Sequence, residues 1–355
     1  MDGNGGAGDD RGRAGLRAPA PPRLRADGWH GSLTLEFGRQ DGVTRLLRNR
    51  HEGPLRLLKA LQAADGRALE AVVVHPPGGL VGGDSLSLRV AASDGAHVLV
   101  TTPGAQKWYR AERAARSEVD LSLRAAPRDG LPLPAIVFDA ARVAQHLSIR
   151  MDAASTCIGW EILVRGRAAM GERWRRGDIE QSMTIEVDGR ALWQERLVAD
   201  AADRIFESPI GWGGRTVAAS VWCCAPALGG QALAALRDDW CDAIGAPGGA
   251  PGGATGGATG GATGGATGGA TGGATGGATG GPAGGPAGGP AGGLADGAAD
   301  GAADGAATCA ADGLVLARML GDDVEHLQAR CQHLWSLART LLDGVPGAPP
   351  RLWRT

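Results

Sequence analysis

The chain has 355 residues, and its 36 Lys and Arg against 38 Asp and Glu give a net charge of −2. A balance this close to neutral gives no reason to expect nucleic acid as a partner. No run of about 18 apolar residues occurs, so we expect no membrane-spanning helix, and the N-terminal residues lack the apolar core of a signal peptide. The six cysteines form no CxxC pair and indicate a reduced, cytoplasmic protein.

Residues 1–27 consist largely of Gly, Ala, Pro, Asp and Arg and are predicted to form a disordered tail. From 28 to 244, short stretches of alternating apolar and polar residues are separated by turn signals. WHGSLTLEF (29–37) is the clearest stretch, with its Trp, Leu and Phe residues on one face. This pattern predicts one large, mainly β domain of stacked or β-helix-like sheets, and the frequent turns favour mostly antiparallel pairing.

Two β-hairpins are expected from Asp-Gly turns between alternating stretches. The first joins SLSLRV (85–90) to AHVLV (96–100) through Asp94–Gly95, and the second is centred on Asp188–Gly189. Asp-Gly is favoured in two-residue hairpin turns because both positions adopt positive φ angles readily.

Helices are expected only late in the chain. QALAALRDDWCDAI (231–244) predicts a short helix. After Asp322, apolar residues recur every three or four positions, which predicts a long amphipathic C-terminal helix capped by Asp322 or Asp323. Its apolar face is expected to pack on the β domain, and binding of a partner protein is the alternative.

A repeat of GGAT, then GGPA, then ADGA occupies residues 245–313. This composition cannot bury a core and predicts a flexible insert. Residues 314–355 would then return to the same domain, and deletion of 248–306 is expected to be tolerated.

The most distinctive sequence lies in two loops rich in glycine and proline. HPPGGLVGGD spans 75–84, and TTPGAQKWY spans 101–109. The second loop contains Lys107, one of two lysines, and Tyr109, the only tyrosine. Glycines here can simply permit tight turns. A phosphate cradle fits poorly, because no GxxxxGK[ST] or GxGxxG motif occurs and no helical pattern follows.

Together with GPLRLLK (53–59), GWEILVRGR (159–167), GERWRRG (171–177) and PRLWRT (350–355), these loops resemble the urease accessory protein family UreD, also called UreH. The motifs occur in the family's order. The positions that carry the resemblance are Gly78, Gly79, Gly82, Gly83, Thr101, Thr102, Pro103, Gly104, Lys107, Tyr109, Trp160, Gly166, Arg167 and Gly171.

The resemblance implies a chaperone without catalytic activity that binds apo-urease. With UreF and the GTPase UreG it would support nickel insertion into the urease active site, with UreE as an indirect nickel donor. No cofactor would be tightly bound, and Ni²⁺ would bind only transiently.

Because Ni²⁺ accepts imidazole and oxygen ligands, His75, Asp84, Glu161 and Glu172 are candidates for a nickel route. Each carboxylate has a structural alternative, since a carboxylate beside a Gly-rich loop commonly accepts backbone N–H bonds.

The segment before Ile136 departs from the family, which usually reads close to LEWLPQE where this chain has GLPLPAIVF (130–138). No role of the family's acidic residue is carried over. Two alternatives therefore stay open. One is a diverged β-rich interaction protein with no urease role. The other is an enzyme that uses the loops between His75 and Tyr109, with Lys107 or Tyr109 as acid or base.

The remaining histidines and cysteines suggest no metal site. His326 and His333 lie seven positions apart on the predicted C-terminal helix, a poor spacing for chelation. Cys223 and Cys224 are expected to be buried thiols, with a soft-metal site as the alternative. Four histidines fall on strands or turns and are expected to be exposed: His30, His51, His97 and His146.

Overall fold

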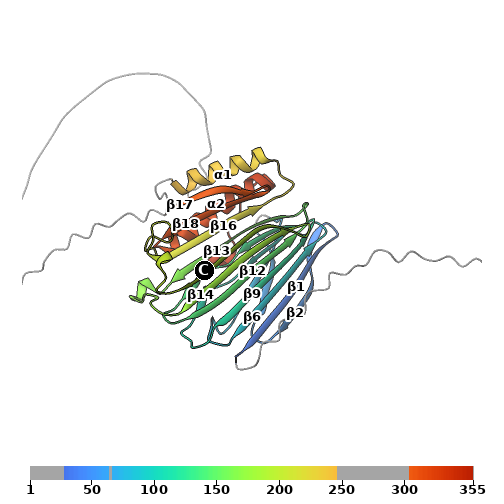
Figure 1. Cartoon of the computed structure of the whole chain (residues 1–355). Helices are drawn as coiled ribbons and strands as arrows, with labels where there is room; N and C mark the ends of the chain where they lie inside the picture. Colours follow the sequence, from blue (N-terminus) through green and yellow to red (C-terminus); the bar gives the residue numbers. More distant parts are fainter. Residues whose placement is uncertain (1–27, 64–65, 246–303, 355) are drawn as a thin grey trace, which may run out of the picture.

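The computed structural model describes residues 28–63, 66–245 and 304–354. Two β-sheets face each other, and two helices cover the outer face of one of them (Figure 1). The predicted N-terminal tail and most of the predicted insert lie outside the described residues. No helix in the described ranges has the length and apolar character needed to cross a membrane.

The first sheet has seven strands in the order β15-β14-β12-β9-β6-β1-β2. Its five central strands are parallel neighbours, and the two edge strands pair antiparallel. The strands are β1 (His30–Gln40), β2 (Val43–Glu52), β6 (Ser85–Ser93), β9 (Ala115–Arg124), β12 (Arg142–Met151), β14 (Asp178–Val187) and β15 (Arg190–Asp200).

The second sheet has eleven strands, of which eight follow the order β17-β18-β16-β13-β10-β7-β4-β3. Three short strands pair beside that path, with β11 next to β13, then β8, then β5. The strands are β3 (Arg56–Gln62), β4 (Leu69–Val74), β5 (Gly79–Leu80), β7 (Val98–Thr101), β8 (Gln106–Trp108), β10 (Pro127–Leu131), β11 (Ala135–Val137), β13 (Thr156–Arg165), β16 (Val217–Cys224), β17 (Asp304–Ala311) and β18 (Leu314–Gly321).

The chain winds between the two sheets as a coil from β6 to β14. Each turn adds one strand to the first sheet and one or two to the second, always parallel to the strand before. The β-helix-like expectation is therefore confirmed, and the expectation of mostly antiparallel pairing is wrong for the body of the protein. Alternation in a sequence indicates which face of a strand is buried, but it does not indicate which strand is the neighbour.

The two predicted hairpins have opposite outcomes. Asp188–Gly189 joins β14 to β15 as an antiparallel hairpin, as expected. Asp94–Gly95 does not form a hairpin, because β6 and β7 belong to different sheets. Both residues of this turn have positive φ, which turns the chain from one sheet to the other.

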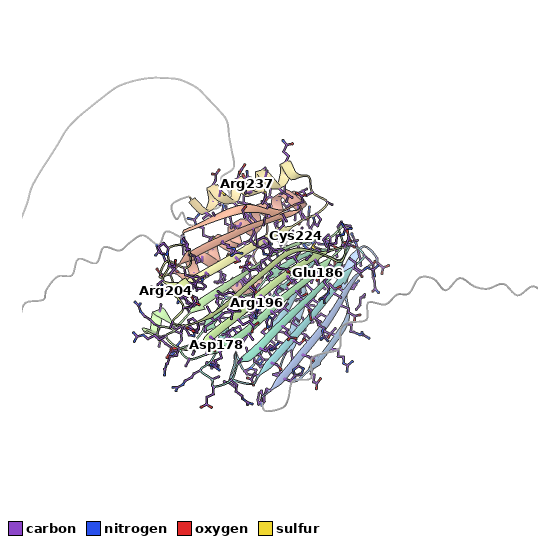
Figure 2. The ribbon with its side chains drawn as sticks, viewed as in Figure 1. Asp178, Glu186, Arg196, Arg204, Cys224 and Arg237 are labelled. Carbon is purple, nitrogen blue, oxygen red and sulfur yellow. The ribbon has the colours of Figure 1, made fainter. Side chains whose placement is uncertain are left out.

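The main core lies between the sheets, and a second core lies between the larger sheet and the helices. On β1, Leu33, Leu35 and Phe37 are buried, as their alternation predicts. Trp29 was expected on the same face, but it precedes the strand and is 67% exposed. On the outer face of the smaller sheet, Figure 2 shows charged side chains such as Asp178 and Arg196.

The helices are α1 (Gly230–Gly245) and α2 (Val324–Asp343), with one-turn helices η1 (Ala168–Met170), η2 (Arg204–Phe206) and η3 (Arg351–Arg354). The Asp323 side chain caps α2 by accepting hydrogen bonds from two backbone N–H groups, as expected. Residues 304–311 belong to the predicted flexible insert, but they form β17, which pairs with β18. Strand β18 in turn pairs with β16, so both strands extend the larger sheet.

Candidate functional site

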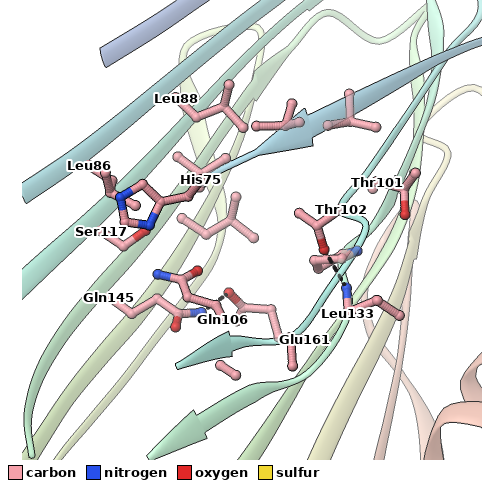
Figure 3. Close-up of a pocket in the computed structure, with 18 of the residues that line it drawn as sticks. His75, Leu86, Leu88, Thr101, Thr102, Gln106, Ser117, Leu133, Gln145 and Glu161 are labelled. Carbon is pink, nitrogen blue, oxygen red and sulfur yellow. Dashed lines mark hydrogen bonds between the residues drawn. The ribbon is translucent and has the colours of Figure 1, made fainter. Parts of the chain in front are cut away.

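A cavity of about 390 Å³ lies inside the coil between the two sheets (Figure 3). Strands β6, β9 and β12 supply one wall, and β4, β7, β10 and β13 supply the other. The lining is mainly apolar, so its few polar side chains determine what the cavity can bind. These side chains include His75, Thr101, Thr102, Gln106, Ser117, Gln145 and Glu161.

Glu161 on β13 is the carboxylate at the centre of the polar part of this cavity. It accepts hydrogen bonds from Gln145 Nε2 at 2.8 Å and from Gln181 Nε2 at 3.2 Å. Burial away from bulk solvent, together with the charge of Glu195, raises the pKa of Glu161 to about 7, although the two amide hydrogen bonds oppose this. At neutral pH this group therefore exchanges readily between an acid and a carboxylate.

His75 lies at the end of β4, where the first Gly-rich loop begins. Burial lowers the pKa of His75, and the nearby charge of Asp84 only partly opposes that effect. A neutral imidazole has a free ring nitrogen that can accept a hydrogen bond or bind a metal ion.

Two glutamines in the cavity wall were not predicted as site residues. Gln145 Oε1 and Gln106 Nε2 are buried and have no hydrogen-bond partner within the part of the chain that the structure describes. Buried amide atoms are usually paired, so these two are available to a guest in the cavity. Figure 3 shows both side chains close to Glu161. The sequence offered no signal for them, because glutamines on strands are common and belong to no motif.

Asp84 and Glu172 do not line the cavity. Asp84 accepts backbone N–H bonds from Trp29 at 2.9 Å and Val81 at 3.0 Å, which fastens the start of β1 to the first Gly-rich loop. Glu172 accepts the Asp139 N–H at 2.7 Å and pairs with Arg167. Both carboxylates therefore have a structural role as acceptors of backbone N–H bonds. Of the four candidates for a nickel route, only His75 and Glu161 line the cavity.

The residues that carry the family resemblance divide between the cavity wall and its surroundings. Thr101, Thr102, Pro103, Gly104, Gly78 and Trp160 line the cavity. Gly79 packs against the ring of Tyr109, where an added Cβ would lie 2.4 Å from a ring atom. Gly166 has positive φ and lies against the backbone of residues 172–174, next to the Arg167–Glu172 pair. The remaining positions, Gly82, Gly83, Lys107 and Gly171, do not line the cavity.

The segment that departs from the family pattern is ordered and contributes to the cavity. It forms the end of β10 and β11, and Gly130, Pro132, Leu133 and Ala135 are part of the lining. The Trp160 indole donates to the Pro132 carbonyl at 2.8 Å, and the Leu133 N–H donates to Thr102 Oγ1 at 3.0 Å. The segment that departs from the family pattern is therefore an ordered, hydrogen-bonded part of the cavity wall.

The enzyme hypothesis requires a pocket that contains both Lys107 and Tyr109. Neither residue lines the cavity. Tyr109 instead packs edge-on against Phe138, with ring centroids 4.9 Å apart. The geometry does not support acid or base chemistry by this pair.

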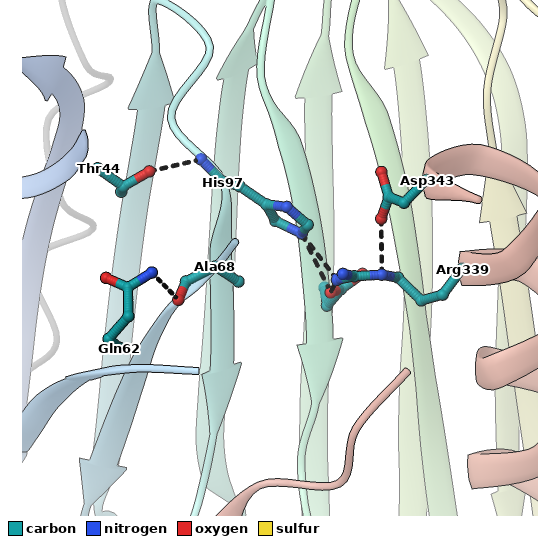
Figure 4. Close-up of polar contacts among 7 residues, drawn as sticks. Thr44, Gln62, Ala68, His97, Arg339 and Asp343 are labelled. Atoms are coloured by element: carbon teal, nitrogen blue, oxygen red, sulfur yellow. Dashed lines mark hydrogen bonds and ion pairs between the residues drawn. The ribbon is translucent and has the colours of Figure 1, made fainter. Parts of the chain in front are cut away.

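A buried ionic cluster lies on the other side of the larger sheet, where α2 packs (Figure 4). Arg339 Nη1 is 2.6 Å from Asp129 Oδ2 and 2.9 Å from His97 Nε2. His97 is only 8% exposed, so the expectation that it lies at the surface is wrong. Burial alone would raise the pKa of Asp129, but His97 and Arg339 outweigh it and hold the pKa below its usual value.

The described residues contain no cluster of three His, Cys, Asp or Glu side chains suited to hold a metal ion. Cys223 and Cys224 are buried and free, as expected, and burial raises the pKa of both thiols. His326 is half-buried and contacts Arg330, whereas His333 is exposed. The polar side chains that line the cavity carry nitrogen and oxygen atoms, and none of the cysteines lines it.

Comparison with known proteins shows to which protein family the chain belongs. The profile described as "UreD urease accessory protein" matches residues 30–354. A urease accessory protein UreD from Dechloromonas aromatica is 39% identical over 223 residues, which cover 62% of this chain and 77% of that protein. Proteins of the same name from Cupriavidus metallidurans and Pseudomonas aeruginosa are each 30% identical, with 92% of this chain and 95% of the relative aligned. The chain therefore belongs to the UreD family of urease accessory proteins, a non-catalytic family that serves urease maturation.

Proposed function

We propose that this chain is a chaperone that binds apo-urease and, with UreF and the GTPase UreG, supports nickel insertion into the urease active site. The family match over residues 30–354 carries the proposal, because it spans the coil and both helices. UreE would supply nickel indirectly, and GTP hydrolysis would belong to UreG. Cys223, Cys224, Cys241, Cys309 and Cys331 are free thiols, which is typical of proteins in the reducing cytoplasm.

Within this role, the cavity is the part of the molecule best suited to carry nickel. Ni²⁺ accepts imidazole and oxygen ligands. His75 offers a neutral imidazole, Glu161 a carboxylate and Gln145 an unpaired amide oxygen. None of the cysteines lines the cavity, so a passing ion would meet exchangeable ligands rather than thiolates that hold it. Nickel is cargo in this scheme and does not reside in the protein.

Assembly is tested by co-expressing the tagged chain with its urease subunits, UreF and UreG, and analysing what elutes with it by size-exclusion chromatography. We expect a stable complex that contains UreF or apo-urease. Recovery of the folded chain alone would contradict the proposal and favour the diverged interaction protein.

The nickel route is tested by narrowing the cavity. Ser117 lines it from β9, whereas Ser122 lies on the outer face of the same strand. Ser117→Leu is expected to lower urease activation several-fold while the complex still assembles, and Ser122→Leu is the matched control. Equal activation by the two variants, with both complexes intact, would exclude the cavity as the route.

A further inference from the structure

A loop at residues 203–215 presents an isoleucine that the fold leaves fully exposed. Ile210 at the tip is 99% exposed, and Ile205 in the same loop is 39% exposed. Met170 ends the one-turn helix η1, which precedes Trp174 in the chain, and it is 74% exposed. Exposed apolar side chains of this size cost free energy in water, unless another surface covers them.

Hydrogen bonds within the loop hold its backbone in place. The Asp203 side chain caps η2 by accepting the Ile205 N–H at 2.9 Å. The Trp212 N–H donates to the Ile205 carbonyl at 2.8 Å, and the N–H groups of Gly211 and Gly213 both donate to the Ser208 carbonyl at 2.9 Å. These bonds close the loop on both sides of Ile210.

An aromatic cluster anchors the same loop to the body of the protein. Phe206 packs edge-on between Trp174 and Trp212, with ring centroids 5.4 Å and 5.3 Å away. The buried Arg165 guanidinium stacks on Phe206 at 4.2 Å and on Trp212 at 4.9 Å. Because Trp174 follows the η1 turn in sequence, the cluster supports both segments that carry the exposed apolar residues. A surface ordered in advance loses little conformational entropy when it binds.

The charges around these apolar residues are mainly positive. Arg173, Arg175 and Arg204 are exposed and form no ion pair within the described part of the chain. The nearby carboxylates are mostly engaged, with Glu172 on Arg167, Asp139 on Arg176 and Asp322 on Arg215. Asp203 and Glu207 are the exposed exceptions, and Asp203 accepts the Ile205 N–H. The surface thus combines an apolar projection with free guanidinium groups.

We infer that residues 168–175 and 203–215 form a protein-docking surface, in which Ile210 inserts into an apolar socket rimmed by carboxylates on a partner protein. A rigid, projecting side chain fits a socket, and aspartates or glutamates at its rim would complement the free arginines. The inference rests on the proposed function only for the choice of partners, which are the other components of urease maturation and urease itself.

The test uses the full chain, tagged and incubated separately with purified UreF, UreG and apo-urease. Ile210→Asp should lower recovery of one of these partners at least about tenfold, as expected for a central anchor residue. Arg173→Glu combined with Arg175→Glu should weaken the same partner and make the remaining binding less sensitive to salt. Leu58→Asp, at a 52% exposed leucine on β3, is the matched control and should bind normally.

The outcomes separate this inference from the proposed function. Ile210 makes little contact with the fold, so its variant should melt at the wild-type temperature. Normal recovery of every partner by Ile210→Asp, when the wild type binds them, would overturn the docking surface and leave the proposed function standing. Recovery of no partner by the wild type would overturn both. Retention of the wild type on anionic vesicles, lost in Ile210→Asp while partner recovery stays normal, would assign the surface to a membrane and also overturn the inference.

Discussion

Glu161 shows how the fold gives one residue properties that its sequence context does not. Its motif neighbours are apolar, and it lies where Gln145 and Gln181 from the opposite sheet reach it. Because burial raises the pKa of Glu161 to about 7, the folded protein holds a proton that the unfolded chain releases near pH 4.5, the usual pKa of a glutamate. The stability that this proton contributes is fully present below about pH 4.5 and is lost as the pH rises through 7.

Replacing this carboxyl by an amide should remove that pH dependence. We expect Glu161→Gln to be more stable than the wild type at pH 8 by roughly 1–3 kcal/mol, and nearly equal to it at pH 5. Urea unfolding at the two pH values measures the difference. Glu186→Gln, on the outer face of β14, serves as the control. If Glu161→Gln changes the unfolding free energy equally at both pH values, burial does not raise the pKa of Glu161.

At the residue scale, the sequence located part of the site. His75 and Glu161 were predicted from the motifs that contain them, and both line the cavity, whereas Asp84 at the end of the same Gly-rich loop does not. Gln106 and Gln145 were missed, since an amide has no charge or motif that marks it. Arg339 did leave a signal: it falls within the apolar stripe of α2, four positions after Trp335. A charge on a buried face requires a buried partner, and Asp129 is that partner.

At the scale of elements, the periodicities predicted most strands and both helices, but not how the strands pair. The parallel order depends on turns such as Asp94–Gly95, which can close a hairpin or pass the chain to a second sheet. Strand β17 was missed because its residues, DGAATCAA, continue the composition of the repeat before it. Its pairing with β18 is a tertiary effect that local composition does not indicate.

The attachment of α2 to the larger sheet depends on the Arg339–Asp129 pair. Arg339→Met would leave the Asp129 carboxylate buried without its cation, so we expect a loss of about 3–5 kcal/mol in unfolding free energy. The double variant Asp129→Asn with Arg339→Met removes both charges and should lose clearly less. Urea titration followed by tryptophan fluorescence measures both. If Arg339→Met loses no more unfolding free energy than the double variant, the Arg339–Asp129 ion pair does not hold α2 on the sheet.

At the scale of the whole molecule, the described residues on either side of the repeat segment lie close together. An added Cβ on Gly305 in β17 would lie 3.1 Å from Ile244 Cγ2 near the end of α1. A short connection is therefore sufficient between residue 245 and residue 304. The expectation that deletion of 248–306 is harmless needs correction, because its last three residues belong to β17 and pair with β18.

Replacing residues 246–303 by a Gly/Ser linker of about six residues should leave both stability and partner binding unchanged. Extending the replacement to residue 306 should lower the melting temperature, because it removes part of a strand. Calorimetry on the two proteins makes the comparison. A large loss of stability in the shorter replacement would show that the segment does more than connect its neighbours.

The central claim is that this chain supports nickel delivery to urease. The most direct measurement is the nickel content of urease purified from cells that express UreE, UreF and UreG, with and without this chain. We predict urease close to fully loaded when the chain is present and largely free of nickel when it is absent. Equal nickel content in the two preparations would contradict the account.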